Sequence, residues 1–110
     1  MRNKTQSAVW TTKYKNDLPD SAFMYIEPGG KKDGEGKTTP RSLRHFPYKD
    51  SNGKIDIIHV RNAISRIPQA KISSKLKSRL QKRARTILSK LRKSKADLLL
   101  LFLNRGNING

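Results

Sequence analysis

Apolar residues recur every three or four positions through the second half of the chain. Over residues 73–93 they fall within about 160° of one helical face when successive residues are placed about 100° apart, which predicts an amphipathic helix. The polar positions of this stretch fall on the opposite face. The apolar positions are Ile72, Leu76, Leu80, Ala84, Ile87, Leu88 and Leu91.

A second, shorter helix is predicted over residues 57–67. Asp56 precedes it and can accept from the free N–H groups of its first turn, and Pro68 ends it. Because only a few residues separate the two helices, they should form an antiparallel helical hairpin. The apolar positions of the shorter helix are Ile57, Val60, Ala63, Ile64 and Ile67.

The first half of the chain carries shorter, β-type patterns. Residues 23–27 are rich in aromatic and β-branched side chains, and residues 42–46 can form the returning strand. The Gly- and Lys-rich stretch 31–40 between them is predicted to be an exposed loop. Two strands alone are barely stable in water, so a helix should cover one face. The predicted fold class is therefore α+β and mostly helical, with a β-hairpin packed on a helical hairpin.

Both ends of the chain differ from this central module, which we place at residues 17–93. Residues 1–16 are polar and basic and are predicted to be a flexible arm. Its aromatic residues Trp10 and Tyr14 either stack on nucleic-acid bases or pack against the protein's own domain. Residues 94–110 are predicted to be a short apolar C-terminal helix or tail.

The tail contains the longest apolar run of the chain, from Leu98 to Leu103. Ser94 and Asp97 before it fit a helix-capping pair, which predicts a separate helix, although the same pair also fits inside one continuous helix. Six residues cannot cross a bilayer, which takes about 20. The run either closes a small core or is buried in a second copy or a larger assembly; contact with an anionic membrane is a weaker alternative.

Charge adds the strongest functional signal. The chain has 25 Lys and Arg against 8 Asp and Glu, a formal net charge of +17, and residues 57–96 hold thirteen of the basic residues and no acidic residue. A helix with one apolar and one strongly cationic face predicts binding of a polyanion, most often nucleic acid. Solubility alone needs less charge.

The candidate phosphate contacts lie mainly on the longer helix, where a basic row spans about 27 Å at about 1.5 Å per residue. Lys and Arg there would neutralise phosphates and release condensed counterions. Basic residues of the shorter helix and of the loop 31–40 would extend this surface. The predicted nucleic-acid-binding residues are Lys31, Lys32, Lys37, Arg61, Arg66, Lys75, Arg79, Lys82, Arg83, Lys90 and Lys93.

The enzymatic alternatives depend on few residues. His45, Asn52 and His59 follow the order of side chains in ββα-metal nucleases, where histidines activate water and hold a divalent metal. Asn52 also fits a turn with Gly53, and Asp56 fits a helix cap, so an HNH-like metal-dependent nuclease is a minor alternative. The chain has no cysteine, which excludes disulfides and Cys-based zinc or thiol chemistry. We expect no catalytic residue, metal site, cofactor or small-molecule substrate.

Three spaced blocks carry a family resemblance: residues 18–23 (LPDSAF), 44–48 (RHFPY) and 59–69 (HVRNAISRIPQ). Together they resemble a small uncharacterised module of tailed bacteriophages, which occurs alone or attached to larger proteins such as head-maturation proteases. The resemblance covers about residues 17–92. It implies a phage or prophage origin and a small α+β domain, and it offers no catalytic residues to carry over to this chain. The more basic second helix and the apolar tail depart from the module's pattern.

These observations predict a non-enzymatic nucleic-acid-binding protein in a phage context, with DNA weakly favoured over RNA. The first alternative is a structural accessory protein of a phage particle, whose charge faces packaged DNA or an acidic protein surface. The second is the small nuclease. No apolar segment follows the basic N-terminus as a secretory signal requires, so we expect the host cytoplasm or the virion interior.

Overall fold

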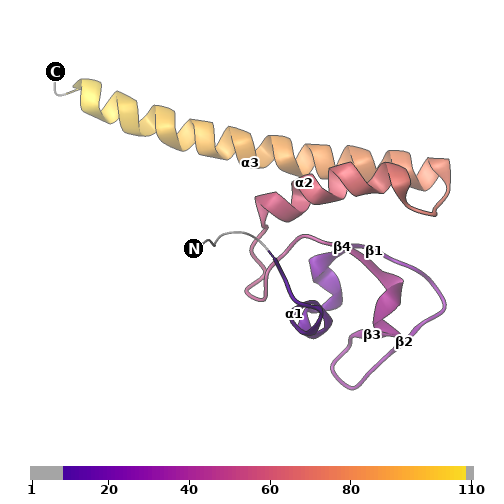
Figure 1. Cartoon of the computed structure of the whole chain (residues 1–110). Helices are drawn as coiled ribbons and strands as arrows, with labels where there is room; N and C mark the ends of the chain where they lie inside the picture. Colours follow the sequence, from indigo (N-terminus) through magenta and orange to yellow (C-terminus); the bar gives the residue numbers. More distant parts are fainter. Residues whose placement is uncertain (1–8, 109–110) are drawn as a thin grey trace.

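The computed structural model describes the backbone of residues 9–108, and side chains over residues 9–95 together with Leu99 and Leu100. Three α-helices and four short strands follow one another along this part of the chain, joined by turns and 3-10 segments (Figure 1). Their bounds are α1 Thr12–Asp17, β1 Phe23–Ile26, β2 Lys31–Lys32, β3 Thr38–Thr39, β4 Arg44–Pro47, α2 Ile57–Arg66 and α3 Ser74–Ile108.

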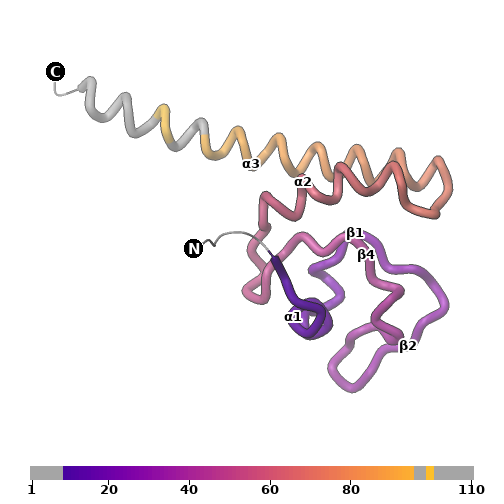
Figure 2. The backbone as a smooth tube through the Cα atoms, in the orientation of Figure 1, coloured from indigo at the N-terminus to yellow at the C-terminus, as the bar shows by residue number. Residues whose placement is uncertain are grey.

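The predicted β-hairpin is confirmed in its pairing. β1 and β4 run antiparallel, with Phe23 opposite Pro47 and Tyr25 opposite His45. The returning strand begins at Arg44, two residues later than predicted, because residues 41–43 form a 3-10 turn. The helical hairpin of α2 and α3 covers this pair, so the predicted mixed α+β class is confirmed (Figure 2).

The stretch 31–40 is not the plain loop that was predicted, because β2 and β3 pair within it. The Asp33 side chain closes the turn between them by accepting from the backbone N–H groups of Glu35 and Lys37, at 2.9 and 3.0 Å. The N–H of Lys37, the Arg41 guanidinium and the N–H of Glu35 lower the pKa of Asp33 to about 2. The Asp33 carboxylate thus stabilises the turn of a strand pair too short to show a β-pattern in the sequence.

The two predicted helices form the main core with the β1–β4 pair. Asp56 caps α2, accepting from the N–H of His59 at 3.3 Å, and Val60 and Ile67 of this segment are fully buried. Leu80 and Ala84 are buried from the α3 side, against Met24 and Tyr48. The remaining apolar positions predicted on this face of α3 also pack on the core: Ile72, Leu76, Ile87, Leu88 and Leu91. The predicted apolar face of the longer helix is confirmed.

The prediction of a separate C-terminal helix is wrong, because α3 continues without a break from Ser74 to Ile108. Ser94 and Asp97 lie inside it. From Ser74 to Asn104 the sequence contains neither proline nor glycine to interrupt the backbone hydrogen bonds. Leu99 and Leu100 are 60% and 58% exposed, so they do not close the core as one alternative predicted. The side chains of the other residues in the run 98–103 lie outside the described part.

Residues 9–16 are packed against the domain, which corrects the prediction of a free arm for this part; residues 1–8 lie outside the described residues. Thr11 caps α1 by accepting from the N–H of Tyr14 at 3.0 Å. Trp10 and Tyr14 pack against a second, smaller core of Leu18, Ala22 and Phe23. Of the two uses foreseen for these aromatic side chains, packing on the protein's own domain is the one observed.

Candidate nucleic-acid interface

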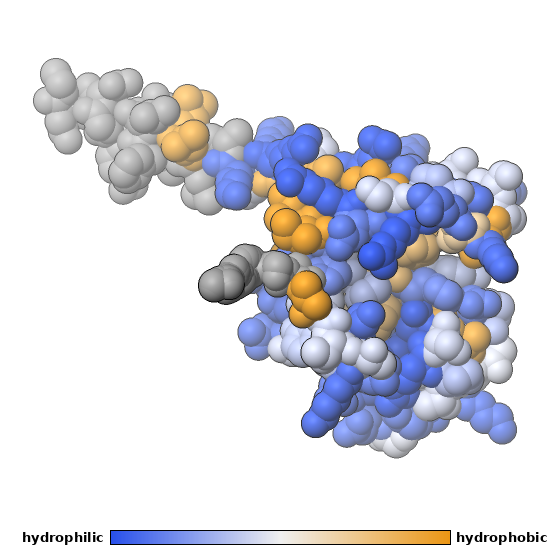
Figure 3. All heavy atoms as spheres, in the orientation of Figure 1, coloured by the Kyte–Doolittle hydropathy of each residue, from blue (hydrophilic) through white to orange (hydrophobic). Residues whose placement is uncertain are grey.

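The cationic face of α3 consists of basic residues on the side away from the apolar core, with Arg83 at its edge beside Tyr48. All of those predicted on this helix are exposed, and hydrophilic side chains lie along much of the visible surface of α3 (Figure 3). The core occupies the opposite face, so these charges cannot be buried without a partner. The exposed predicted residues are Lys75, Arg79, Lys82, Arg83, Lys90 and Lys93.

No carboxylate neutralises this face within the described side chains. All six ion pairs found there use acidic residues of the segment 9–56, and none includes a residue of α3. Among the described side chains, α3 cations donate to neutral acceptors alone: Lys77 to the carbonyl of Pro68 at 2.8 Å, and Arg83 to Tyr48 and Met24. The positive potential of the helix is therefore available to an external anion.

A groove of about 570 Å³ runs between α3 and the turn before α2. Tyr48, Lys49 and Ile55 form one wall, and α3 supplies the other wall with four basic residues. The Lys49 Nζ lies 5.5 Å from the centroid of the Tyr48 ring. This groove gathers five cations around a largely apolar floor, an arrangement suited to a phosphate backbone. The α3 cations that line it are Arg79, Lys82, Arg83 and Lys90.

Arg83 has a double role that its position in the sequence did not reveal. Its guanidinium donates to the Tyr48 hydroxyl at 3.2 Å and to the Met24 carbonyl at 3.4 Å, and lies 5.8 Å from the Tyr48 ring centroid. It therefore ties α3 to the strand pair as well as lining the groove. Lys49 was missed because it lies in a turn, and only the packing of that turn beside α3 brings it into the groove.

The other predicted contacts lie apart from this face. Lys32 pairs with Asp20 at 2.8 Å and Lys37 pairs with Glu35 at 2.9 Å, so their charges are partly neutralised. Lys31 is exposed on β2, and Figure 1 shows β2 and β3 at the far end of the molecule from α3. The structure thus does not bring the lysines of the loop 31–40 together with α3 as one continuous surface.

The basic residues of α2 also separate from the groove. Arg61 and Arg66 are both exposed, but neither lines the space beside α3. Arg66 instead lines a separate cavity, together with residues of the N-terminal segment and β4. The α2 arginines therefore contribute to the positive potential without sharing the groove.

Both histidines of the nuclease alternative contact a carboxylate of the protein itself. His45 Nε2 lies 2.5 Å from Glu27 Oε2, and His59 Nδ1 makes a short contact with the Asp56 carboxylate. Asn52 lies in an exposed turn, where its N–H donates to Asp50. Within the described residues, no three potential metal ligands among His, Asp and Glu come together. The geometry therefore offers no preformed ligand set for a nuclease metal.

A buried network fixes the N-terminal segment beside β4. Arg44, 6% exposed, donates to the carbonyls of Leu18 at 2.6 Å and Lys15 at 3.0 Å, and to the Asp20 carboxylate at 3.3 Å. Burial lowers the pKa of Arg44, but a guanidinium remains charged at neutral pH. Burial alone would raise the pKa of Asp20, but hydrogen bonds from Lys32 and Thr38 outweigh it and hold that pKa well below its usual range. The network is structural and fixes the backbone of Lys15, Asn16 and Leu18 beside β4.

Comparison with protein-family models, curated proteins and solved structures finds no match to this chain. The resemblance to a phage module therefore stays a prediction made from three sequence blocks. Among the helices of the described residues, none combines the length and the apolar character that crossing a membrane requires.

Proposed function

We propose that this protein binds nucleic acid through contacts between the cationic face of α3 and the phosphate backbone. The observation that carries this proposal is the unneutralised charge of α3. Thirteen basic residues and no acidic one lie between residues 57 and 95, and no ion pair of the described side chains includes an α3 cation. Such a surface gains free energy by displacing counterions from phosphates.

The dimensions of α3 suit a duplex. The exposed row from residue 75 to residue 93 spans about 27 Å on a rigid helix. A DNA duplex carries about one charge per 1.7 Å of its axis, so several phosphates lie within reach of such a row. A straight, pre-ordered helix loses little conformational entropy when it binds a straight polymer. These considerations favour a duplex over single strands, and the weak preference for DNA over RNA remains part of the proposal.

We further propose that binding has little sequence preference. Readout of base edges needs polar side chains that project from the binding face. Gln81, the amide residue best placed on α3, instead donates through Nε2 to the carbonyl of Ile64 at 3.1 Å. The other exposed side chains of this face are mainly Lys and Arg, and such side chains contact mainly phosphates in protein–DNA complexes. The phage origin and a location in the host cytoplasm or the virion interior belong to the same proposal.

Charge reversal at two lysines of the groove tests the proposal. Lys82 and Lys90 are exposed and make no hydrogen bond with the described residues, so replacing both with Glu removes cations without removing core contacts. We expect the double variant Lys82→Glu, Lys90→Glu to lose affinity for a 20-base-pair duplex at least 30-fold in a gel-shift titration. The matched control is Lys13→Glu, Lys31→Glu, which changes the net charge equally. Equal losses in both variants would contradict a role specific to α3.

One observation favours a second function, that of an accessory protein in a phage assembly. Leu99 and Leu100 are more than half exposed on the continuation of α3. Exposed leucines on a helix are typical of a surface that another protein covers. If they contact a second copy, the mass measured by light scattering should fall to that of a monomer in the variant Leu99→Glu, Leu100→Glu. A monomer in both proteins would remove self-association as an explanation.

A further inference from the structure

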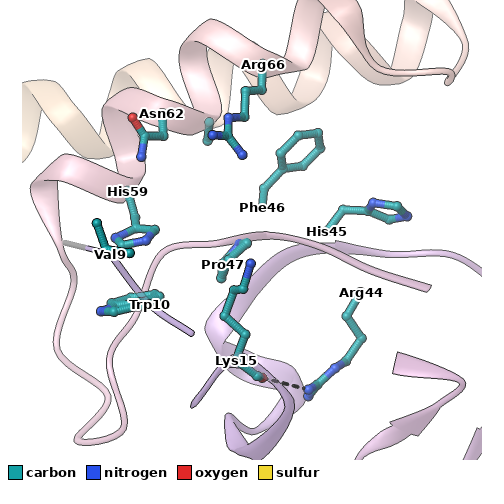
Figure 4. A pocket seen from close by; sticks show the side chains of 11 residues that line it. Val9, Trp10, Lys15, Arg44, His45, Phe46, Pro47, His59, Asn62 and Arg66 are labelled. Atoms are coloured by element: carbon teal, nitrogen blue, oxygen red, sulfur yellow. Dashed lines mark hydrogen bonds between the residues drawn. The ribbon is translucent and has the colours of Figure 1, made fainter. Parts of the chain in front are cut away.

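A cavity of about 450 Å³ lies between the N-terminal segment, β4 and α2 (Figure 4). Its volume is within the range of small-molecule sites, about 300–1,000 Å³. It is distinct from the groove beside α3, because the two share no lining residue. The polar and aromatic residues that line it include Trp10, Lys15, Phe46, His59, Asn62 and Arg66.

Two cations enter the cavity from opposite walls. Lys15 comes from α1 and Arg66 from α2, and Figure 4 shows the charged ends of both directed toward the space between these helices. Neither side chain forms a hydrogen bond or ion pair with another described residue, and no carboxylate lines the cavity. Arg44 also borders it but is held by backbone carbonyls. Lys15 and Arg66 are thus the groups positioned to hold a bound anion.

Aromatic side chains form the walls around these charges. The Trp10 and His59 rings are stacked, with centroids 3.5 Å apart and an interplanar angle of 14°. Phe46 is the only non-glycine residue in the described part with a positive φ, 60°. A bulky residue rarely adopts this conformation, and such backbone strain is concentrated at functional sites. The strained backbone conformation places the Phe46 side chain between β4 and α2, at the edge of the cavity.

We propose that this cavity binds one nucleotide, with its phosphate between Lys15 and Arg66. The base would lie against the aromatic walls, where its π-face can stack, and the Asn62 amide can donate to and accept from a base edge. The two cations match the phosphate of a nucleotide, and the aromatic faces and the amide match its base, whereas an aliphatic carboxylate would leave the aromatic walls unused. The proposal does not depend on the α3 face and goes beyond nonspecific phosphate binding.

The single tryptophan of the chain reports on the cavity directly, because Trp10 lines it. Titrating the full chain with thymidine 5′-monophosphate should change the tryptophan emission in a saturable way. Thymidine, which has the same base without the phosphate, should bind at least tenfold more weakly. Removing one charged contact, in Lys15→Gln or Arg66→Gln, should weaken binding of the monophosphate about tenfold. Lys13→Gln, on the same helix but outside the cavity, is the control.

The same readout separates the two sources of such a nucleotide. A short oligonucleotide with a 5′-phosphate, compared with the same strand ending in a 5′-hydroxyl, tests whether the cavity takes the end of a strand. A saturable response to either phosphorylated probe that Lys15→Gln or Arg66→Gln weakens supports the proposal, and the tighter probe identifies the source. The absence of a saturable response to both, or equal binding of monophosphate and thymidine, overturns it.

Failure of this proposal is distinguishable from failure of the α3 interface. The variant Lys82→Glu, Lys90→Glu should keep the full fluorescence response to thymidine 5′-monophosphate, because neither lysine lines the cavity. A loss of that response in this variant, with circular dichroism unchanged, would contradict a separate site.

Discussion

Two regions of this small protein treat charge in opposite ways. Residues 9–56 carry nine basic and seven acidic side chains, whereas residues 57–95 carry thirteen basic side chains and no acidic one. In the first region, carboxylates are used within the fold. Asp20 and Asp33 hold the strand pairs and turns together, and Asp56 caps α2. In the second region the fold depends on apolar packing, and the cations face outward.

This difference indicates how a chain with a formal net charge of +17 can fold. Mutual repulsion of like charges destabilises a compact state. Here the region of balanced charge supplies the hydrogen-bonded framework, and the apolar face of α2 and α3 supplies most of the buried core. Most of the unbalanced charges are exposed side chains of α2 and α3, where solvent and salt screen them. The cost in stability is then concentrated where a polyanionic partner can remove it.

The largest effect should come from the apolar core that holds α2 and α3 together. Ile67 is fully buried at the end of α2, so Ile67→Ala should lower the free energy of unfolding by about 3 kcal/mol. Ile58→Ala, at a position 43% exposed, should cost less than about 1 kcal/mol. Urea denaturation followed by circular dichroism measures both. Equal effects would mean that α2 does not pack as described.

A smaller loss is expected from the charge network of the first region. Asp20 accepts from the N–H and hydroxyl of Thr38 at 2.9 and 2.6 Å and pairs with Arg44. Asp20→Asn removes the negative charge beside a buried guanidinium and should cost about 2 kcal/mol. Asp17→Asn, at an exposed carboxylate without an ion pair among the described residues, should change stability by less than about 0.5 kcal/mol. An unchanged midpoint for Asp20→Asn would refute the structural role of this network.

Acid should affect the two regions differently. The fold lowers the pKa of Asp33 from 3.8 to about 2, so its contribution to stability is present above about pH 4 and is lost as the pH falls toward 2. Hydrogen exchange followed by NMR should show the amides of Glu35 and Lys37, which bind this carboxylate, losing protection in that window. Amides of α3 on the core side should stay protected to lower pH. Simultaneous loss everywhere would indicate a single global transition instead.

Salt should stabilise the protein slightly, because the second region is destabilised by its own charge. Raising NaCl from 10 to 200 mM shortens the Debye length from about 30 to about 7 Å and should raise the melting temperature by about 2–4 °C. The variant Lys82→Glu, Lys90→Glu should show a smaller rise. A melting temperature that falls with salt would mean that ion pairs, not repulsion, dominate.

The helical half was predictable because its pattern is local. Spacing alone identified all seven apolar positions between Ile72 and Leu91 that pack on the core, and Asp56 was identified as the cap of α2. The continuity of α3 was missed in favour of a separate C-terminal helix, because a capping pair and an interior pair look alike in sequence. The exposed positions of the α3 cations followed from the same periodicity.

The rest depended on contacts between residues far apart in the chain. Packing of Trp10 on His59, 49 positions later, orders a segment whose composition is typical of a flexible arm. The β2–β3 pair depends on the Asp33 and Asp20 side chains, and Lys49 enters the groove only through tertiary packing. The cavity around Lys15 and Arg66 combines α1, β4 and α2, so no local pattern could have revealed it.

The salt dependence of duplex binding tests the central claim most directly. If six to eight phosphates contact α3, the association constant should fall by roughly the fifth to seventh power of the salt concentration between 50 and 200 mM NaCl. In the variant Lys82→Glu, Lys90→Glu the exponent should drop by about two. A wild-type affinity that is flat across this range, or an exponent that the two substitutions leave unchanged, would contradict the account.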